Sequence, residues 1–358
     1  MRDFSESPLL VLWEVTQACD LACRHCRAAA QPERNEAELS TSEAYEVLDQ
    51  IRELGNPLVV FTGGDPLKRP DLFNLIERSV GLGLRTTVTP SATPLLTRAA
   101  VARFKDSGVS RMAVSLDGPN KEIHDGFRGV AGSYARTMAA LHMAAKIGLE
   151  TQINTTVARH NVEWLEQIAR IVADTHARLW SVFFLVVTGR ARLEDDLPGE
   201  EYERVFEFLY KLSLIAAFDI KTTEAPHYRR FYAQQRKLSG GGSMAPDGPA
   251  ASGASPIQRY AGINDGKGLL FISHTGEIYP SGFLELSAGN IRACRLTDAY
   301  RNSELFQVIR DSDQLEGKCG VCDYRYLCGG SRSRALALTG NFMASDPRCV
   351  YQPTGRPE

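Results

Sequence analysis

Short apolar segments alternate with helical segments along the first half of the chain, and this alternation restricts the fold more than any other feature of the sequence. Apolar segments typical of buried strands span 9–15, 57–64, 84–90, 111–118, 149–157 and 178–187. Segments with helical periodicity span 41–54, 70–83, 97–106, 133–147, 161–175 and 200–217. Strands joined by helical crossovers pair in parallel with right-handed connections. The pattern therefore predicts an α/β fold, either a partial barrel or an open sheet.

Polar motifs follow several of these strands directly. "CDLACRHC" (19–26) comes after the first strand, and "TGGDP" (62–66) ends the second. The carboxyl ends of parallel strands meet at one edge of the sheet, and α/β enzymes place their chemistry there. We therefore expect the two motifs to lie close together in a functional site.

The length of 358 residues favours one large domain and a smaller one. We expect a barrel at 1–218, a connecting segment at 219–259 and a C-terminal domain at 260–358. Residues 237–256 are rich in Gly, Ser, Pro and Ala, which is typical of a flexible loop or linker, with a lid over substrate as the alternative. The C-terminal part opens with "GLLFISHTGEIYPSGF", which predicts a hairpin that turns at Thr275–Gly276.

Composition excludes some classes of partner. With a net charge of −2, the sequence has no excess of basic residues that would bind nucleic acid or an anionic membrane surface. The opening "MRDFSESPLL" lacks the apolar core of a signal peptide, and no apolar run is long enough to span a bilayer. We expect a cytoplasmic protein that binds neither nucleic acid nor membrane. In that reducing compartment, clustered cysteines indicate metal ligands or catalysts rather than disulfides.

The cysteines are gathered near the two ends of the chain. Cys19, Cys23 and Cys26 form one group, and Cys319, Cys322, Cys328 and Cys349 form another, whereas Cys294 stands alone. Cysteines used only for core packing would be scattered. The distribution therefore predicts two separate metal centres, one near each end of the chain.

Three cysteines in a loop solve a specific chemical problem. Three thiolates hold three irons of a [4Fe–4S] cube, and the fourth iron stays open to a small chelating ligand. If that ligand is the amino and carboxylate groups of S-adenosylmethionine, one electron from the cluster cleaves its sulfonium bond. The product, a 5′-deoxyadenosyl radical, abstracts hydrogen from an unactivated carbon. A zinc site completed by His25 is the alternative.

"CDLACRHC" resembles the signature of the radical S-adenosylmethionine (radical SAM) superfamily, and "TGGDP" resembles its Gly-Gly-Glu-Pro element. The resemblance implies a partial (β/α)6 barrel in which Gly63, Gly64 and Asp65 bind the methionine amino group through the backbone. It further implies that Ser115 and Asn154 contact the ribose and that His25 packs near the adenine. Asp65 departs from the usual Glu and is alternatively a turn residue before Pro66. Ser115 and Asn154 are alternatively structural. The family's Thr-Asn-Gly after the third strand is absent, so nothing is assigned in "TPSATPL".

"CGVCDYRYLCGG" with "SDPRCVY" resembles the SPASM/twitch extension of radical SAM enzymes, a small α+β domain that holds auxiliary iron–sulfur clusters. Full SPASM domains hold two clusters. Here Ser331 and Ser281 stand where relatives have cysteine, so the resemblance implies one auxiliary [4Fe–4S] cluster on Cys319, Cys322, Cys328 and Cys349. Zinc at that site is the alternative. Cys294 is interpreted as a free buried thiol, or otherwise as a substitute ligand.

"FISHTGEIYPSGF", "AGNIR" and "CGGSRSRA" resemble the superfamily branch that tailors tetrapyrroles in heme biosynthesis. A porphyrin propionate is therefore the first substrate hypothesis, and a ribosomally made peptide the second. Arg27, Arg128 and Arg259 are candidate propionate contacts, and His274 and Tyr279 are candidate proton-handling residues. The resemblance implies a flavodoxin or ferredoxin as electron donor. A non-catalytic iron–sulfur or zinc scaffold is the competing hypothesis, and cleavage of S-adenosylmethionine separates the two.

Overall fold

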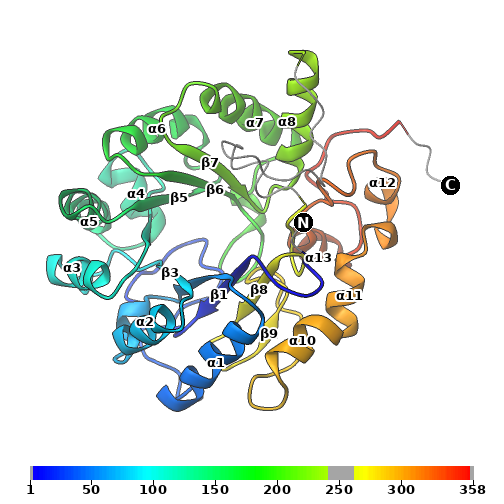
Figure 1. Cartoon of the computed structure of the whole chain (residues 1–358). Helices are drawn as coiled ribbons and strands as arrows, with labels where there is room; N and C mark the ends of the chain where they lie inside the picture. Colours follow the sequence, from blue (N-terminus) through cyan, green and yellow to red (C-terminus); the bar gives the residue numbers. More distant parts are fainter. Residues whose placement is uncertain (1–2, 241–261, 355–358) are drawn as a thin grey trace.

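The computed structural model describes residues 3–240 and 262–354, and its parallel strands form a half-barrel covered by helices (Figure 1). The strands are β1 (Leu10–Glu14), β2 (Leu58–Thr62), β3 (Arg85–Val88), β4 (Arg111–Ser115), β5 (Thr151–Val157), β6 (Leu179–Phe184), β7 (Asp219–Thr223), β8 (Leu269–Ile272) and β9 (Ile278–Tyr279). The helices are α1 (Thr41–Glu53), α2 (Leu72–Gly81), α3 (Arg98–Asp106), α4 (Lys121–Arg128), α5 (Ser133–Ile147), α6 (Leu165–Asp174), α7 (Gly199–Ser213), α8 (His227–Leu238), α10 (Leu296–Asn302), α11 (Glu304–Arg310), α12 (Gly317–Gly320) and α13 (Arg332–Thr339).

Within the described residues the strands form one sheet in the order β7-β6-β5-β4-β3-β2-β1-β8-β9. Neighbours from β7 to β8 are parallel, and only β9 runs antiparallel to β8. β1 lies between β2 and β8, with Leu10 in register with Leu58 on one side and Leu269 on the other. The loop that follows β1 therefore starts beside strands from both halves of the chain.

The predicted partial barrel is confirmed, and all six predicted strands are present with slightly shorter bounds. The predicted hairpin is also present, as β8 and β9 with a turn at 273–277. Several elements differ from the sequence analysis: α4 was not predicted, β7 and α8 lie in the segment that was expected to be a connection, and the C-terminal helices α10 to α13 were not individually predicted. β8 joins the barrel sheet beside β1. The boundary at 259/260 remains a prediction.

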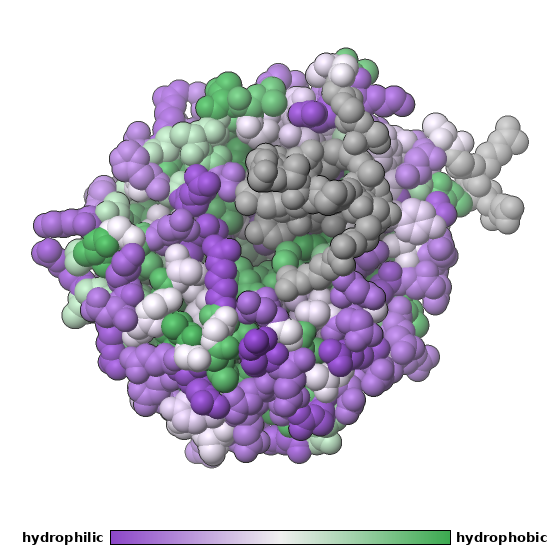
Figure 2. Space-filling model, viewed as in Figure 1, coloured by the Kyte–Doolittle hydropathy of each residue, from purple (hydrophilic) through white to green (hydrophobic). Residues whose placement is uncertain are grey.

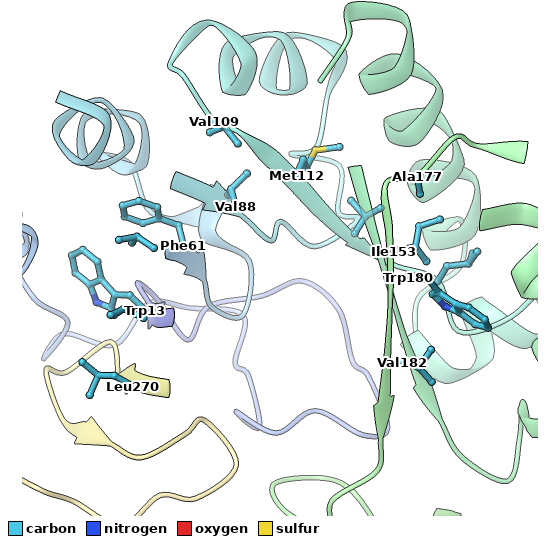
Figure 3. Packing of buried hydrophobic residues seen from close by; sticks show 14 of the residues in the cluster. Trp13, Phe61, Val88, Val109, Met112, Ile153, Ala177, Trp180, Val182 and Leu270 are labelled. Atoms are coloured by element: carbon cyan, nitrogen blue, oxygen red, sulfur yellow. The ribbon is translucent and has the colours of Figure 1, made fainter. Parts of the chain in front are cut away.

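Side chains on the helix-facing side of the sheet form the main core. Figure 3 shows Trp13, Phe61, Val88 and Met112 on consecutive strands, packed in a continuous layer that helices cover. Each of these side chains is fully buried. Removing that much apolar surface from water is the main stabilising term for such a fold.

Helix α1 begins and ends where its sequence indicates. The Ser40 hydroxyl accepts from the amide of Glu43, and the Glu43 carboxylate accepts from the amide of Ser40, which forms a capping box. The helix ends just before Gly55, whose φ of +116° favours glycine. Glu43 also pairs with Arg292, so the start of α1 is tied to the C-terminal part of the chain.

Hydrophilic side chains cover most of the rim on the face seen in Figure 2, over the outer helices. No helix among residues 3–240 and 262–354 is both long and apolar enough to cross a membrane. Most of the predicted flexible stretch 237–256 lies outside the described residues, as does Arg259.

Candidate functional site: a cysteine loop at the mouth of the half-barrel

The three N-terminal cysteines lie in one loop after β1, and none of them forms a disulfide with another described cysteine. Cys19 and Cys23 are buried, and Cys26 packs beside them with partial exposure. The amide of Leu21 donates to Sγ of Cys19 at 3.3 Å, and the amide of Ala30 donates to Sγ of Cys26 at 3.4 Å. Backbone donors aimed at sulfur are the usual surroundings of iron–sulfur thiolates, so the loop fits such a cluster.

Gly63 and Gly64 bring the end of β2 into direct contact with the cysteine loop. The amide of Gly64 donates to the carbonyl of Thr16 at 2.8 Å, and the next amide donates to the carbonyl of Ala18 at 2.7 Å. A Cβ on Gly63 would lie 2.5 Å from the carbonyl oxygen of Thr16, and one on Gly64 would lie 2.4 Å from that of Gln17. Only glycine allows this approach, which is a second reason for the motif besides the backbone role implied by the resemblance.

The side chain of Asp65 accepts hydrogen bonds from the loop after β3 and so stabilises that loop. Its carboxylate accepts from the amide of Leu67 at 3.2 Å, the amide of Ser91 at 3.3 Å and the hydroxyl of Thr93 at 2.6 Å. Burial raises the pKa of Asp65 to about 6. These contacts give the side chain a structural role, while the backbone role of Asp65 toward a cofactor stays a prediction.

Ser91 belongs to the site although the sequence analysis assigned nothing in this loop. Its hydroxyl donates to the carbonyl of Gly64 at 2.7 Å and lies 3.6 Å from Sγ of Cys19. Burial raises the pKa of Cys19 to about 11. Because a thiol must lose its proton to bind iron, the amide of Leu21, which donates to the same sulfur, helps to stabilise the thiolate.

Ser115 and Asn154, which the resemblance implies as ribose contacts, lie side by side on neighbouring strands. They are register partners in β4 and β5. Both side chains are partly exposed, and the Asn154 carbonyl oxygen accepts from Nε2 of Gln152 at 2.7 Å. Their contact with a ribose remains a prediction.

His25 lies in a stack of rings on the inner side of the cysteine loop. Its ring is parallel to that of Phe127 at 4.0 Å between centroids, and His160 stacks on the other face of Phe127 at 3.6 Å. Burial lowers the pKa of His25 to about 3, so the ring is neutral. Among the described residues, Nδ1 of His25 has no hydrogen-bond partner. The predicted contact with adenine is not tested by this geometry.

Two arginines, one after β6 and one at the end of α4, contact the cysteine loop. Arg190, after β6, donates to the carbonyl of Cys23 at 2.9 Å and to that of Ala30 at 3.0 Å. Arg128, at the end of α4, lies 3.7 Å from Sγ of Cys23 and pairs with Asp117. Arg128 is thus buried beside the cysteines, and its contact with a substrate propionate stays a prediction.

The four C-terminal cysteines line one cavity. Cys319, Cys322, Cys328 and Cys349 surround it together with His227, Arg230 and Lys318. The amide of Tyr324 donates to Sγ of Cys322 at 3.4 Å, and the amide of Gly330 donates to Sγ of Cys328 at 3.3 Å. Neighbouring cations and sulfur-directed amides suit an anionic cluster. Cys294 does not line this cavity, and its thiol donates to the carbonyl of Asn290.

Among the residues that the structure describes, no three His, Cys, Asp or Glu side chains converge as ligands of a single metal ion. A tetrahedral zinc site would bring its sulfurs within about 3.8 Å of each other, as follows from its Zn–S bonds. Zinc stays an alternative for both cysteine groups.

Serines that replace cysteines of relatives form a buried polar cluster near the auxiliary site. The hydroxyls of Ser281 and Ser333 lie 3.3 Å apart, and Ser333 also bonds to Asp265 at 3.0 Å. Ser331 donates to Glu224 at 2.7 Å. Glu224 follows β7 with a left-handed φ of +58°, which is a strained backbone for this residue type. The serines are thus used in hydrogen bonds with buried carboxyl groups.

Replacing Glu224 by glutamine is expected to stabilise the protein increasingly as pH rises. Burial, and then the charge of Asp265, raise the pKa of Glu224 from 4.5 to about 8 in the folded chain. Between those two values the folded state binds more protons than the unfolded state, so wild-type stability falls with rising pH by about 1 kcal/mol per unit. Glutamine has no proton to lose. Melting of Glu224→Gln and wild type at pH 5.5 and 8 measures the difference, with exposed Glu36→Gln as control; an equal difference at both pH values contradicts the assignment.

The predicted proton-handling residues lie near the end of β1, around a glutamate that the sequence analysis did not identify. The buried carboxylate of Glu14 pairs with Arg27 and lies 2.8 Å from Nδ1 of His274. Although burial opposes it, the charge of Arg27 with the contact to His274 lowers the pKa of Glu14. Arg27 also lies over the ring of Phe271, on which Tyr279 stacks.

These contacts define the chemistry open to the two catalytic candidates. His274 is oriented by a carboxylate, as histidines that transfer protons commonly are. Burial raises the pKa of Tyr279 to about 12, which favours its neutral form as a hydrogen-bond donor. Their catalytic roles remain predictions.

Comparison with known proteins identifies relatives along the whole chain. Residues 13–172 match the family model described as Radical SAM superfamily. The chain is 41% identical to the AdoMet-dependent heme synthase of Oleidesulfovibrio alaskensis, over 100% of this chain and 91% of that protein. It is 36% identical to the AdoMet-dependent heme synthase of Methanosarcina barkeri, over 99% of each. The structure of Streptococcus suis SuiB bound to S-adenosylmethionine has a TM-score of 0.74 and 18% identity, covering 97% of this chain and 78% of that one, and shows the same fold.

Proposed function

This chain belongs to the radical SAM superfamily, and from that premise we propose that it abstracts hydrogen from a propionate side chain of a tetrapyrrole in heme biosynthesis. The observation that carries the proposal is the full-length similarity to proteins named AdoMet-dependent heme synthase. Because that similarity extends through both cysteine groups rather than the barrel alone, it supports a shared substrate class as well as a shared cofactor.

Membership of the superfamily implies a [4Fe–4S] cluster and S-adenosylmethionine. When bound, the cluster supplies the electron that cleaves S-adenosylmethionine and so provides the radical that abstracts hydrogen. We assign its ligation to Cys19, Cys23 and Cys26, because their loop is buried and carries amides directed at sulfur. Gly63 and Gly64 hold this loop against β2, and Arg190 holds it from the side of β6.

The auxiliary [4Fe–4S] cluster is assigned to Cys319, Cys322, Cys328 and Cys349, which share one cavity. Ser281 hydrogen-bonds with Ser333, while Ser333 and Ser331 donate to the carboxyl groups of Asp265 and Glu224, which supports one auxiliary cluster rather than two. SPASM/twitch character, and a flavodoxin or ferredoxin as electron donor, belong to this proposal.

At the substrate, we propose that Arg27 is the cation beside which a propionate binds, with the Glu14 carboxylate orienting the ring of His274 for proton transfer. Arg27 lies between Glu14 and the more exposed Glu285, so a substrate carboxylate can replace the weaker, solvent-exposed partner. The adjacent Phe271 and Tyr279 rings offer an apolar face that suits a macrocycle.

Anaerobic chemistry tests the proposal. The purified protein should contain about eight irons and eight sulfides, since each cube holds four of each. With dithionite and S-adenosylmethionine it should form 5′-deoxyadenosine. With an added one-electron acceptor, each reacting side chain of iron coproporphyrin should then lose its carboxyl group as CO2, one hydrogen atom to the deoxyadenosyl radical and one electron to the acceptor, as followed by mass spectrometry. Deoxyadenosine without porphyrin conversion would contradict the substrate class and direct the search to peptides. Absence of deoxyadenosine would contradict the enzyme assignment and favour a non-catalytic iron–sulfur or zinc scaffold.

A further inference from the structure

Arg128 connects the cysteine loop to the sheet through a buried ion pair. Its Nη1 lies 3.7 Å from Sγ of Cys23, and its Nε donates to Oδ2 of Asp117 at 2.6 Å. We propose that Arg128, held by Asp117, positions the cysteine loop and raises the reduction potential of the cluster that this loop binds. The inference rests on the proposed function, because it takes Cys23 as a cluster ligand.

Burial makes the charge of this pair effective. The side chain of Asp117 is fully buried, and that of Arg128 is 11% exposed. Water screens a charge poorly at such a site, so a guanidinium beside a thiolate acts more strongly than one at the surface. Although burial opposes ionisation of Asp117, the charge of Arg128 lowers the pKa of this carboxyl, so both partners are charged.

Asp117 is fixed from three directions, which makes it a rigid anchor for Arg128. Its Oδ1 accepts from the amide of Thr156 at 2.7 Å, at the end of β5. Its own amide donates to Nδ1 of His124 at 3.1 Å, and its carbonyl accepts from Nδ2 of Asn161 at 3.1 Å. Because β4, β5 and α4 all contribute, the guanidinium is held in one place relative to the sheet.

The end of α4 also docks onto the cysteine loop through its backbone. The carbonyl of Arg128 accepts from the amide of Ala22 at 3.1 Å, and the carbonyl of Phe127 accepts from the amide of Arg24 at 3.0 Å. Gly129 follows with a φ of +71°, and a Cβ there would lie 2.5 Å from the carbonyl oxygen of Ala22. The end of α4 thus hydrogen-bonds to the residues on both sides of Cys23.

The sign of the effect on the cluster follows from electrostatics. Reduction adds one negative charge to the cluster, and a nearby cation stabilises the reduced form more than the oxidised form. Removing the charge of Arg128 while Asp117 stays ionised should lower the reduction potential. Removing the charge of Asp117 while Arg128 remains should raise it. Opposite shifts from the two halves of one ion pair are the mark of a charge effect, because loss of packing would not produce them.

The test is a redox titration of the anaerobic holoenzyme followed by EPR. The signal that changes when S-adenosylmethionine is added belongs to the cluster with the open iron, so it is separated from the auxiliary signal. At a fixed potential, Arg128→Gln is expected to reduce the ratio of reduced to oxidised cluster about tenfold, equivalent to a shift of about 59 mV for one electron. Asp117→Asn should increase that ratio, and Arg128→Lys should stay near wild type.

Arg111→Gln serves as matched control, because Arg111 pairs with Glu150 at the opposite end of β4 and should leave the potential unchanged. An unchanged potential in Arg128→Gln, or shifts of the same sign in Arg128→Gln and Asp117→Asn, would overturn the inference. So would loss of the cluster from Arg128→Lys as well as Arg128→Gln, since the charge would then not matter. A wild-type protein whose EPR signal does not respond to S-adenosylmethionine would instead contradict the proposed function.

Discussion

Replacing Cys19, Cys23 and Cys26 together by alanine is expected to abolish reductive cleavage of S-adenosylmethionine. All three side chains belong to one loop at the mouth of the half-barrel, and a cube held by three thiolates has no other anchor. Iron should fall by about half, from eight to about four per chain, because the auxiliary cube that we propose for the C-terminal site should remain. Iron content, the EPR spectrum and 5′-deoxyadenosine formation with dithionite measure these effects.

The complementary variant replaces Cys319, Cys322 and Cys328 by alanine and serves as the control. These residues line a separate cavity with Cys349, so this variant should also lose about half of the iron. It should keep the EPR signal that responds to S-adenosylmethionine and should still form deoxyadenosine. Cleavage that survives in the first variant, or disappears only in the second, would show that the two cysteine groups have been assigned the wrong roles.

The barrel could be predicted because its signal is local. Each strand of the βα series is a short apolar run, and each helix has its own periodicity and caps, as with Ser40 and Glu43 in α1. α4 was missed because it is short and follows a strand end rich in turn-forming residues, "DGPN". The place of β8 beside β1 could not be predicted, since pairing over more than 250 residues leaves no mark in the local pattern.

The gathering of the cysteines into two groups could be predicted because cysteine spacing is itself a chemical pattern. Their supporting residues could not. Asp117 and Glu14 are acidic residues that composition alone would place on the surface, and their burial depends on ion pairs with Arg128 and Arg27, which lie outside the strands that precede the two carboxylates. Ser91 lies in a loop that lacks the family's usual motif, so only its contact with Gly64 and Cys19 identifies it.

Gly64→Ala is expected to have an effect as large as loss of the cysteines, without removing any ligand. A Cβ at this position would lie 2.4 Å from the carbonyl oxygen of Gln17 and 2.5 Å from that of Ala18. Since backbone rather than a flexible side chain is in the way, either the end of β2 or the cysteine loop must move. Overpacking of this kind costs about 1–3 kcal/mol. The moved loop should bind the first cluster poorly, so iron should fall by up to half and deoxyadenosine formation should be lost.

Gly81→Ala is the matched comparison, because it tests the same chemical change where space is open. Gly81 is the last residue of α2, and a Cβ built there has no atom within 4 Å. Alanine should be neutral or should stabilise the helix by about 0.5–1 kcal/mol, with full iron content and activity. If Gly64→Ala keeps its iron and its cleavage of S-adenosylmethionine as Gly81→Ala does, close contact between β2 and the cysteine loop is not what the glycine pair provides. If only Gly64→Ala fails, the pair is required because it lets one backbone segment lie directly against another.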